Sequence, residues 1–267
     1  MIQNSCIFCE SSEREFTARE HIVPESLGNT EHMLPPGIVC DWCNNYFARK
    51  VEAPVLNSAF FTQARNRARI PNKRRNIPPI DVLSYPAALH LQLAASTGGE
   101  RSIYATNDAD NDAFVEMITN RKRFSVVFPV PELPSGRLFA RFLAMMALEA
   151  WAKKILDSNG DLHVDLIDKP ELDEIRDFAR FGNGNEAWAY TSRRLYPEDH
   201  HFVDDEGTTF DVLHEYTLLY TDANELYFVI AILGIEFAIN LGGPEIDGYN
   251  DWLKSNHGRS PLYPNGM

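Results

Sequence analysis

The sequence has no apolar run long enough to cross a bilayer, and Met1-Ile2-Gln3-Asn4-Ser5 lacks the basic flank and apolar stretch of a secretory signal. Its C-terminal two thirds contain no glycine-rich phosphate loop and no Ser-His-Asp arrangement. These absences disfavour membrane, secreted, nucleotide-binding and serine-hydrolase classes. We therefore expect a globular cytoplasmic protein, since 267 residues with 44% hydrophobic content can build one large domain or two unequal ones.

Cysteine is scarce, and all four cysteines lie within the first 43 residues as two Cys-x-x-Cys pairs. In a reducing compartment, such pairs are metal ligands more often than disulfides. Each pair places two sulfur atoms at the separation that a tetrahedral zinc site needs. The sequence therefore predicts a structural zinc held by Cys6, Cys9, Cys40 and Cys43.

Positive charge is also scarce, because the chain has a net charge of -13. The deficit is local: residues 1–76 carry +2 and residues 77–267 carry -15. The acidic part would repel DNA, so we expect it to contact a protein partner, to form a homodimer, or to restrain the N-terminal part. Six basic residues directly after the cysteine region are candidates for phosphate contacts, although such a cluster is often only solvated surface: Arg65, Arg67, Arg69, Lys73, Arg74 and Arg75.

Hydrophobic periodicity predicts an α+β protein. A short strand within 15–23, a returning strand at 37–39 and a helix from 44 to about 56, bent or ended by Pro54, form the expected N-terminal module. The composition then predicts a module at 1–63, a basic linker at 64–79 and an acidic mixed domain at 80–267.

The expected mixed domain has strands and helices in irregular alternation. Strand-like runs occupy 80–93, 101–106, 123–130, 210–220, 225–233 and 235–241, and helical runs occupy 111–120, 135 to about 151, and 170–181. Thr221-Asp222-Ala223-Asn224 predicts a hairpin turn. The tail from Gly242 to Met267 has several Gly and Pro residues, so we expect irregular coil over the sheet.

The dipeptide Glu20-His21 lies between the two cysteine pairs, and Asn44 follows the last cysteine. This combination over about residues 6–56 resembles the zinc-containing branch of the HNH endonuclease superfamily, which has the ββα-metal fold. Weaker similarity to the tails of other free-standing HNH proteins extends into the C-terminal part and implies no activity.

The resemblance implies a DNA endonuclease in which Glu20 and Asn44 bind one divalent cation, Mg²⁺ or Mn²⁺. Oxygen ligands suit such ions. His21 would be the general base, because a neutral imidazole near pH 7 can accept a proton from the attacking water. By analogy with similar free-standing nucleases, the chain would act in defence against foreign DNA.

Several alternatives remain open from the residues alone. The zinc ribbon could bind DNA or protein without cleaving, or the substrate could be RNA. Asn44 could be only a helix N-cap. The family's central Asn, which steadies the base, has no counterpart in residues 34–39, and either Asn29 or His32 could replace it.

Overall fold

The protein is described from a computed structural model, which covers all residues except 1–4, 73–74, 121, 184–187, 198–199 and 267. The chain forms two compact units. The first unit comprises Met1–Pro24, Asn29–Val55 and Ser135–Met267, and the second comprises Glu25–Gly28 and Leu56–Pro134. The predicted α+β class is confirmed. The units differ from the expected division at 63 and 79, because the N-terminal segment and the C-terminal half of the chain pack into one body.

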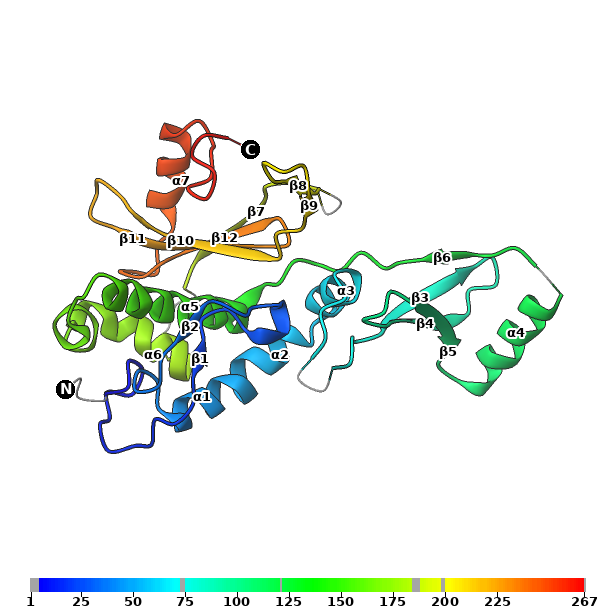
Figure 1. The fold of residues 1–267 in the computed structure, drawn as a ribbon, viewed down its shortest axis with the longest axis horizontal. Helices are drawn as coiled ribbons and strands as arrows, with labels where there is room; N and C mark the ends of the chain where they lie inside the picture. Colours follow the sequence, from blue (N-terminus) through cyan, green and yellow to red (C-terminus); the bar gives the residue numbers. More distant parts are fainter. Residues whose placement is uncertain (1–4, 73–74, 121, 184–187, 198–199, 267) are drawn as a thin grey trace. The chain divides into compact units, whose positions relative to one another are not determined.

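The N-terminal segment contains a small hairpin followed by a helix (Figure 1). Strand β1 (Glu20–His21) pairs antiparallel with β2 (Met33–Leu34), with Glu20 opposite Leu34. The returning strand therefore precedes the predicted position at 37–39. Pro35 and Pro36 cannot donate to a strand ladder, and Gly37 adopts a positive φ of 103°, so the chain turns there.

The helical run after the hairpin begins at Asp41, three residues before the expected start. It consists of α1 (Asp41–Phe47), a π-helical turn, η2 (Ala48–Glu52), and α2 (Ala53–Leu56). Pro54 neither ends nor interrupts this run. Proline lacks the N–H of a regular helical bond, and the widened turn directly before it is a usual way for a helix to adapt.

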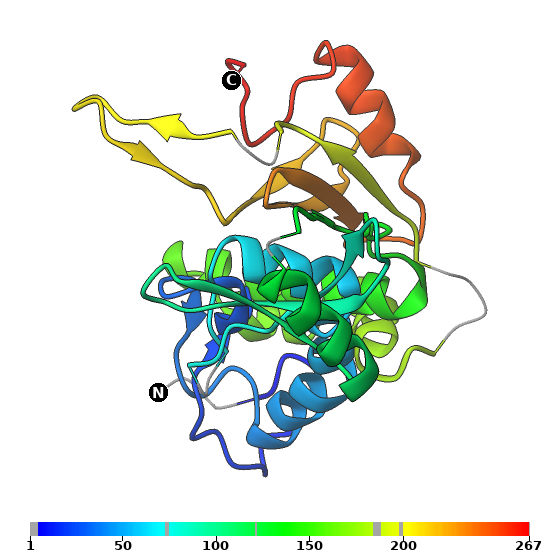
Figure 2. The ribbon, with the colours of Figure 1, turned by 90° about the vertical axis from the view of Figure 1, so that its right-hand side faces the viewer.

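The rest of the first unit is layered (Figure 2). An antiparallel sheet has the order β10-β11-β12-β7 and is contacted on one side by the long helix α5. The elements are α5 (Gly136–Asp157), α6 (Asp173–Phe181), β7 (Tyr190–Arg194), β10 (His214–Tyr220), β11 (Leu226–Ile232) and β12 (Ile235–Asn240). Phe139 of α5 meets Phe237 of β12 with ring centroids 4.9 Å apart. Helix α5 is thus buried, as its apolar residues predict.

The expected coil over the sheet is wrong in part, because the tail contains α7 (Asp247–Ser255). Tyr249 of α7 is fully buried against Tyr227, Val229 and Ala238 of the sheet, with Trp252 beside it. An amphipathic helix covers the apolar strands more completely than coil. Short elements complete this unit: η3 (His163–Ile167), η4 (Pro170–Leu172), β8 (Phe202–Val203) and β9 (Thr209–Phe210).

The second unit is a four-stranded antiparallel sheet in the order β5-β4-β3-β6. Its elements are η1 (Glu25–Leu27), α3 (Ala59–Arg67), β3 (Ile80–Tyr85), β4 (His90–Ala95), β5 (Arg101–Ala105), α4 (Asp108–Thr119) and β6 (Ser125–Val127). Phe114 and Met117 of α4 pack on Val82 and Leu91, so α4 covers one face of the sheet.

The expected linker at 64–79 is helical at its start. Helix α3 runs to Arg67, and the Asn66 side chain donates to the carbonyls of Pro78 (2.8 Å) and Leu93 (3.2 Å). The polar and basic composition hid this helix, because its buried residues include Gln63, Arg65 and Asn66. Among the described residues, no helix combines the length and apolar character needed to span a bilayer.

Candidate active site and zinc centre

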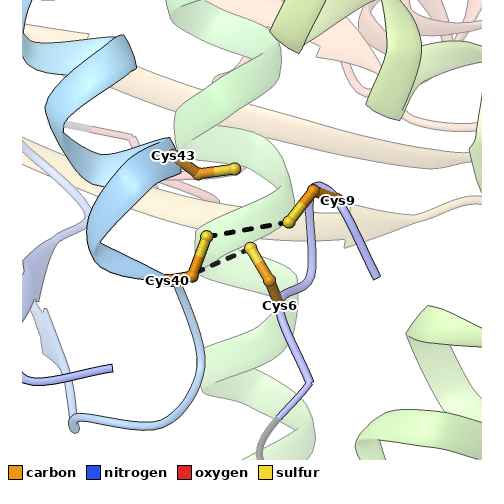
Figure 3. Close-up of side chains that lie close together, drawn as sticks. All are labelled: Cys6, Cys9, Cys40 and Cys43. Carbon is orange, nitrogen blue, oxygen red and sulfur yellow. Dashed lines mark hydrogen bonds between the residues drawn. The ribbon is translucent and has the colours of Figure 1, made fainter. Parts of the chain in front are cut away.

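The four cysteines converge on one point (Figure 3). Their sulfur atoms all lie within 4.8 Å of one another, and none forms a disulfide. Cys6 and Cys9 come from the first loop, Cys40 is the N-cap of α1, and Cys43 lies in its first turn. Sulfur donors at this spacing fit a tetrahedral zinc ion, as the sequence predicts.

The close spacing of the sulfurs shifts the pKa of three thiols, those of Cys6, Cys9 and Cys40. Hydrogen bonding to the Cys6 thiol lowers the pKa of Cys9 to about 4 and that of Cys40 to about 6. The same contacts, together with burial, raise the pKa of Cys6 above its ordinary value. A bound dication would favour the deprotonated form of these ligands, because thiolates and not thiols bind metal ions.

Arg176 of α6 holds the first cysteine loop in place. It is 2% exposed, and its guanidinium donates to the Ile7 carbonyl at 3.0 Å and to the carbonyls of Leu166 and Ile167 at 3.0 and 3.1 Å. It also pairs with Glu10 at 2.6 Å and with Asp173. An element of the C-terminal part thus fixes the chain between Cys6 and Cys9.

Asp41, the first residue of α1, holds the chain that leads into β1. Its carboxylate accepts from the Thr17 amide (2.9 Å), the Thr17 hydroxyl (2.6 Å) and the Ala18 amide (3.0 Å), while its own amide donates to the Glu15 carbonyl (2.9 Å). These hydrogen bonds hold the pKa of Asp41 below its ordinary value. They tie the start of α1 to the segment just before Glu20.

Glu20 and His21 form β1 and therefore occupy successive strand positions. Glu20 is 6% exposed and His21 is half-buried. Side chains alternate along a paired strand, which places Glu20 towards the interior and leaves His21 more accessible.

Asn29 fastens the hairpin that carries these two residues. Its side-chain amide donates to the carbonyls of Val23 and His32, and its oxygen accepts from the amides of Glu31 (3.0 Å) and His32 (2.8 Å). The His32 ring instead packs edge-on against His214 and Tyr216 of β10, with centroids 5.5 and 4.9 Å away, and burial lowers the pKa of His32. Of the two candidates for the family's central Asn, Asn29 is the one bonded to the hairpin backbone.

Asn44 lies inside α1 and is half-buried. The N-cap of this helix is Cys40, so the alternative that Asn44 is only an N-cap is wrong. One helical turn separates Asn44 from Cys40, and the backbone amide of Asn44 donates to the Cys40 carbonyl at 3.0 Å. The zinc ligands therefore fix the position of Asn44.

The predicted basic cluster is divided by the structure. Arg67, Arg69 and Arg75 are exposed in the second unit, whereas Arg65 is 5% exposed. Burial lowers the pKa of Arg65. Lys73 and Arg74 lie outside the described residues.

Sequence reasoning missed Arg176 and Asp41. Arg176 lies on the helix that the apolar residues Leu172, Ile175 and Phe178 predict. The sequence marks it only as a charged residue next to apolar ones, which does not indicate that it is buried. Asp41 lies in the first turn of α1, where acidic residues are favoured. The predicted helix started at Asn44, so Asp41 was not recognised as a residue of the helix N-terminus.

Residues 6–60 match the family model described as HNH endonuclease. No curated protein and no solved structure matches the chain. The match includes all four cysteines, the β1–β2 hairpin and α1. The N-terminal segment, residues 6–60, is therefore an HNH module with four cysteines positioned to bind a metal ion.

Proposed function

We propose that the protein is a metal-dependent endonuclease that hydrolyses phosphodiester bonds of DNA. The observation that carries this proposal is the match of residues 6–60 to HNH endonucleases, together with Glu20, His21 and Asn44 on the hairpin and helix of that module. The zinc centre supports the proposal because it joins the loop before the hairpin to the start of α1.

In the proposed reaction, His21 accepts a proton from the water that attacks phosphorus. Its partial exposure suits contact with a substrate. The carboxylate of Glu20 and the side-chain oxygen of Asn44 hold one Mg²⁺ or Mn²⁺ ion. When bound, this ion supplies positive charge for the phosphate oxygens.

The phosphate backbone of DNA would contact the exposed arginines Arg67, Arg69 and Arg75. A single HNH site cuts one strand, so cleavage of both strands would require two copies or two rounds. A homodimer, or a protein partner bound to the acidic C-terminal part of the chain, belongs to this proposal. So does a role in defence against foreign DNA.

The decisive experiment compares His21→Asn with wild type and with His257→Asn. His257 is exposed beyond the end of α7, so its substitution removes the same imidazole outside the module. We expect His21→Asn to lower Mg²⁺-dependent nicking of plasmid DNA by about 10²–10⁴-fold, because a general base contributes that much. Zinc content and DNA affinity should remain unchanged in both variants.

Equal nicking by wild type and His21→Asn would refute the assignment of His21. Binding of DNA without any metal-dependent cleavage by the wild type would instead favour a zinc ribbon that recognises nucleic acid. Matched DNA and RNA substrates of the same sequence distinguish the two nuclease classes: cleavage of the RNA alone would refute the DNA assignment.

A further inference from the structure

Glu149 is a charged residue in the middle of the buried helix α5. It is 0% exposed, and among the described residues neither of its carboxylate oxygens has a hydrogen-bond partner. Burying a carboxylate without partners costs several kcal/mol, and native proteins rarely leave such a group unsatisfied. Glu149 therefore needs a partner that the described side chains do not supply.

A second buried glutamate of the same unit shows how this chain satisfies such a group. Glu236 of β12 is also 0% exposed, but its carboxylate accepts from Arg193, from the Tyr249 hydroxyl (2.8 Å) and from Ser260. The two glutamates have equal burial and opposite surroundings. The unsatisfied oxygens of Glu149 are thus particular to its site.

Glu149 lies on the helix that supports the HNH module. Helix α5 packs against β2 and against η2. Strand β2 pairs with β1, which carries Glu20, and η2 contains Glu52. Burial and the negative charges of Glu20 and Glu52 raise the pKa of Glu149 well above its ordinary value. The packing of α5 on β2 and η2 places Glu149 on the helix that covers the elements next to Glu20 and Glu52.

Carboxylates gathered in a low-dielectric interior repel one another unless a proton or a cation neutralises them. Mg²⁺ and Mn²⁺ prefer oxygen donors, and one or two carboxylates with water usually hold Mg²⁺. We propose that Glu149 is a ligand of the divalent cation that Glu20 binds, so that α5 supplies part of the metal site of the HNH module.

This inference rests on the proposed function, since it concerns the same cation. It adds that residues 6–60 do not contain the whole metal site. A carboxylate about 90 residues beyond the module completes it. The long helix between the sheet and the HNH hairpin is then part of the active site as well as of the core.

The test measures binding of Mn²⁺ by the full-length, zinc-loaded protein without DNA. Thermal unfolding is followed across a Mn²⁺ titration for wild type, Glu149→Gln, Glu20→Gln and Glu174→Gln. A cation that binds only the folded state stabilises it by RT ln(1 + [Mn²⁺]/Kd), so the Tm increase at a given Mn²⁺ concentration reports the Kd for Mn²⁺. Gln keeps the shape of Glu and removes its charge, and Glu174 is an exposed residue of α6 that serves as the matched control.

We expect Glu149→Gln to need about tenfold or more Mn²⁺ to reach the same Tm increase as wild type, as Glu20→Gln should, while Glu174→Gln should match wild type. Equal Mn²⁺ dependence of Glu149→Gln and wild type would overturn the inference, because Gln mimics a protonated structural Glu. Absence of any Mn²⁺ effect on the wild type would overturn it as well.

Folding of the variants is checked by zinc content and circular dichroism. Should Glu149→Gln not fold, Glu149→Met, which has a similar volume and no charge, is judged by the same Mn²⁺ criterion. Failure of this inference is distinct from failure of the proposed function. A Glu149 variant that binds Mn²⁺ normally leaves the His21-dependent nicking assay unaffected, and an inactive wild type leaves the Mn²⁺ titration interpretable.

Discussion

Asn29 is 1% exposed, yet its amide group is bonded on both sides, donating to two carbonyls and accepting from two amides of the hairpin. Such a residue has a structural effect out of proportion to its size, because its loss leaves several backbone groups without partners. At the residue scale, the HNH module depends on side chains of this kind: Asn29 for the hairpin and Asp41 for the start of α1.

Asn29→Ala should lower the free energy of unfolding by about 3 kcal/mol, since each unsatisfied buried backbone group costs about 1–3 kcal/mol. Urea unfolding, followed by the fluorescence of the tryptophans, measures this change. The exposed neighbour Thr30 provides the control, and Thr30→Ala should change stability by less than about 0.5 kcal/mol. An equal effect of the two substitutions would contradict the role of Asn29.

Asp41 predicts a pH dependence of stability. Its pKa in the folded state lies below the ordinary value, so the hydrogen bonds from Thr17 and Ala18 contribute stability above the unfolded pKa of about 3.9. This contribution is lost as pH falls through the folded pKa. Asp41→Asn should therefore be less stable than wild type at pH 7, by about 1 kcal/mol for a partly exposed group, and the difference should shrink below about pH 4. A difference that stays constant down to pH 3 would contradict this assignment.

At the residue scale, the sequence predicted the cysteines that could bind metal, but not the residues whose hydrogen bonds hold the neighbouring chain in place. The two Cys-x-x-Cys pairs indicated four metal ligands, and the structure brings them together. Hydrogen bonds between distant residues, such as Asp41 with Thr17, have no fixed spacing along the chain. The surroundings of Glu149 were not predictable either. The sequence shows a Glu among apolar helix residues, but it does not show which groups lie next to that Glu in the fold.

At the scale of elements, α6 connects the C-terminal part to the zinc loop through Arg176. The helix itself was predictable, because Leu172, Ile175 and Phe178 share one face and Gly182 ends the run at φ 67°. The core strands β10, β11 and β12 were also predictable from apolar runs and turn residues. The single strand-like run expected at 80–93 is instead two strands, β3 and β4, separated by a turn that contains Pro86. Strand β7 and helices α3 and α7 were missed because their polar and charged residues weaken the hydrophobic pattern.

Arg176→Met should loosen the first cysteine loop. The substitution leaves the carbonyls of Ile7, Leu166 and Ile167 without their donor, which should cost about 3 kcal/mol or more of unfolding free energy. Zinc release to a colorimetric chelator should become faster. Lys169→Gln removes an exposed positive charge just before the same helix and should leave the release rate unchanged. Equal zinc release rates for Arg176→Met and wild type would contradict the role of Arg176 in holding the first cysteine loop.

At the scale of the whole molecule, charge follows the two units. The second unit carries +2, and the first unit, which contains β1, β2 and α1, carries -15. The sequence suggested that acidity begins after residue 76. The division of the chain assigns it instead to the body that includes the HNH hairpin. Attraction of a polyanion must then come from the second unit.

DNA binding should therefore depend on salt through the exposed arginines of the second unit. Arg69→Gln and Arg75→Gln should each reduce the magnitude of the slope of log K against log salt concentration by about 1. With one phosphate contact fewer, binding of DNA releases fewer counterions. Fluorescence anisotropy in a salt series measures this slope. Lys154→Gln, an exposed position on α5 of the acidic unit, should leave it unchanged. A slope unaffected by both Arg substitutions would exclude these residues as phosphate contacts.

The first unit is assembled from segments that lie far apart in the chain, and this determines when the unit can be completed during translation. The cysteine loop leaves the ribosome long before Arg176, which reaches it only after the whole second unit has been synthesised. A nascent or prematurely terminated chain thus has the zinc ligands without the helices that support them. Under the proposed function, a chain that is still being made would not yet cleave DNA.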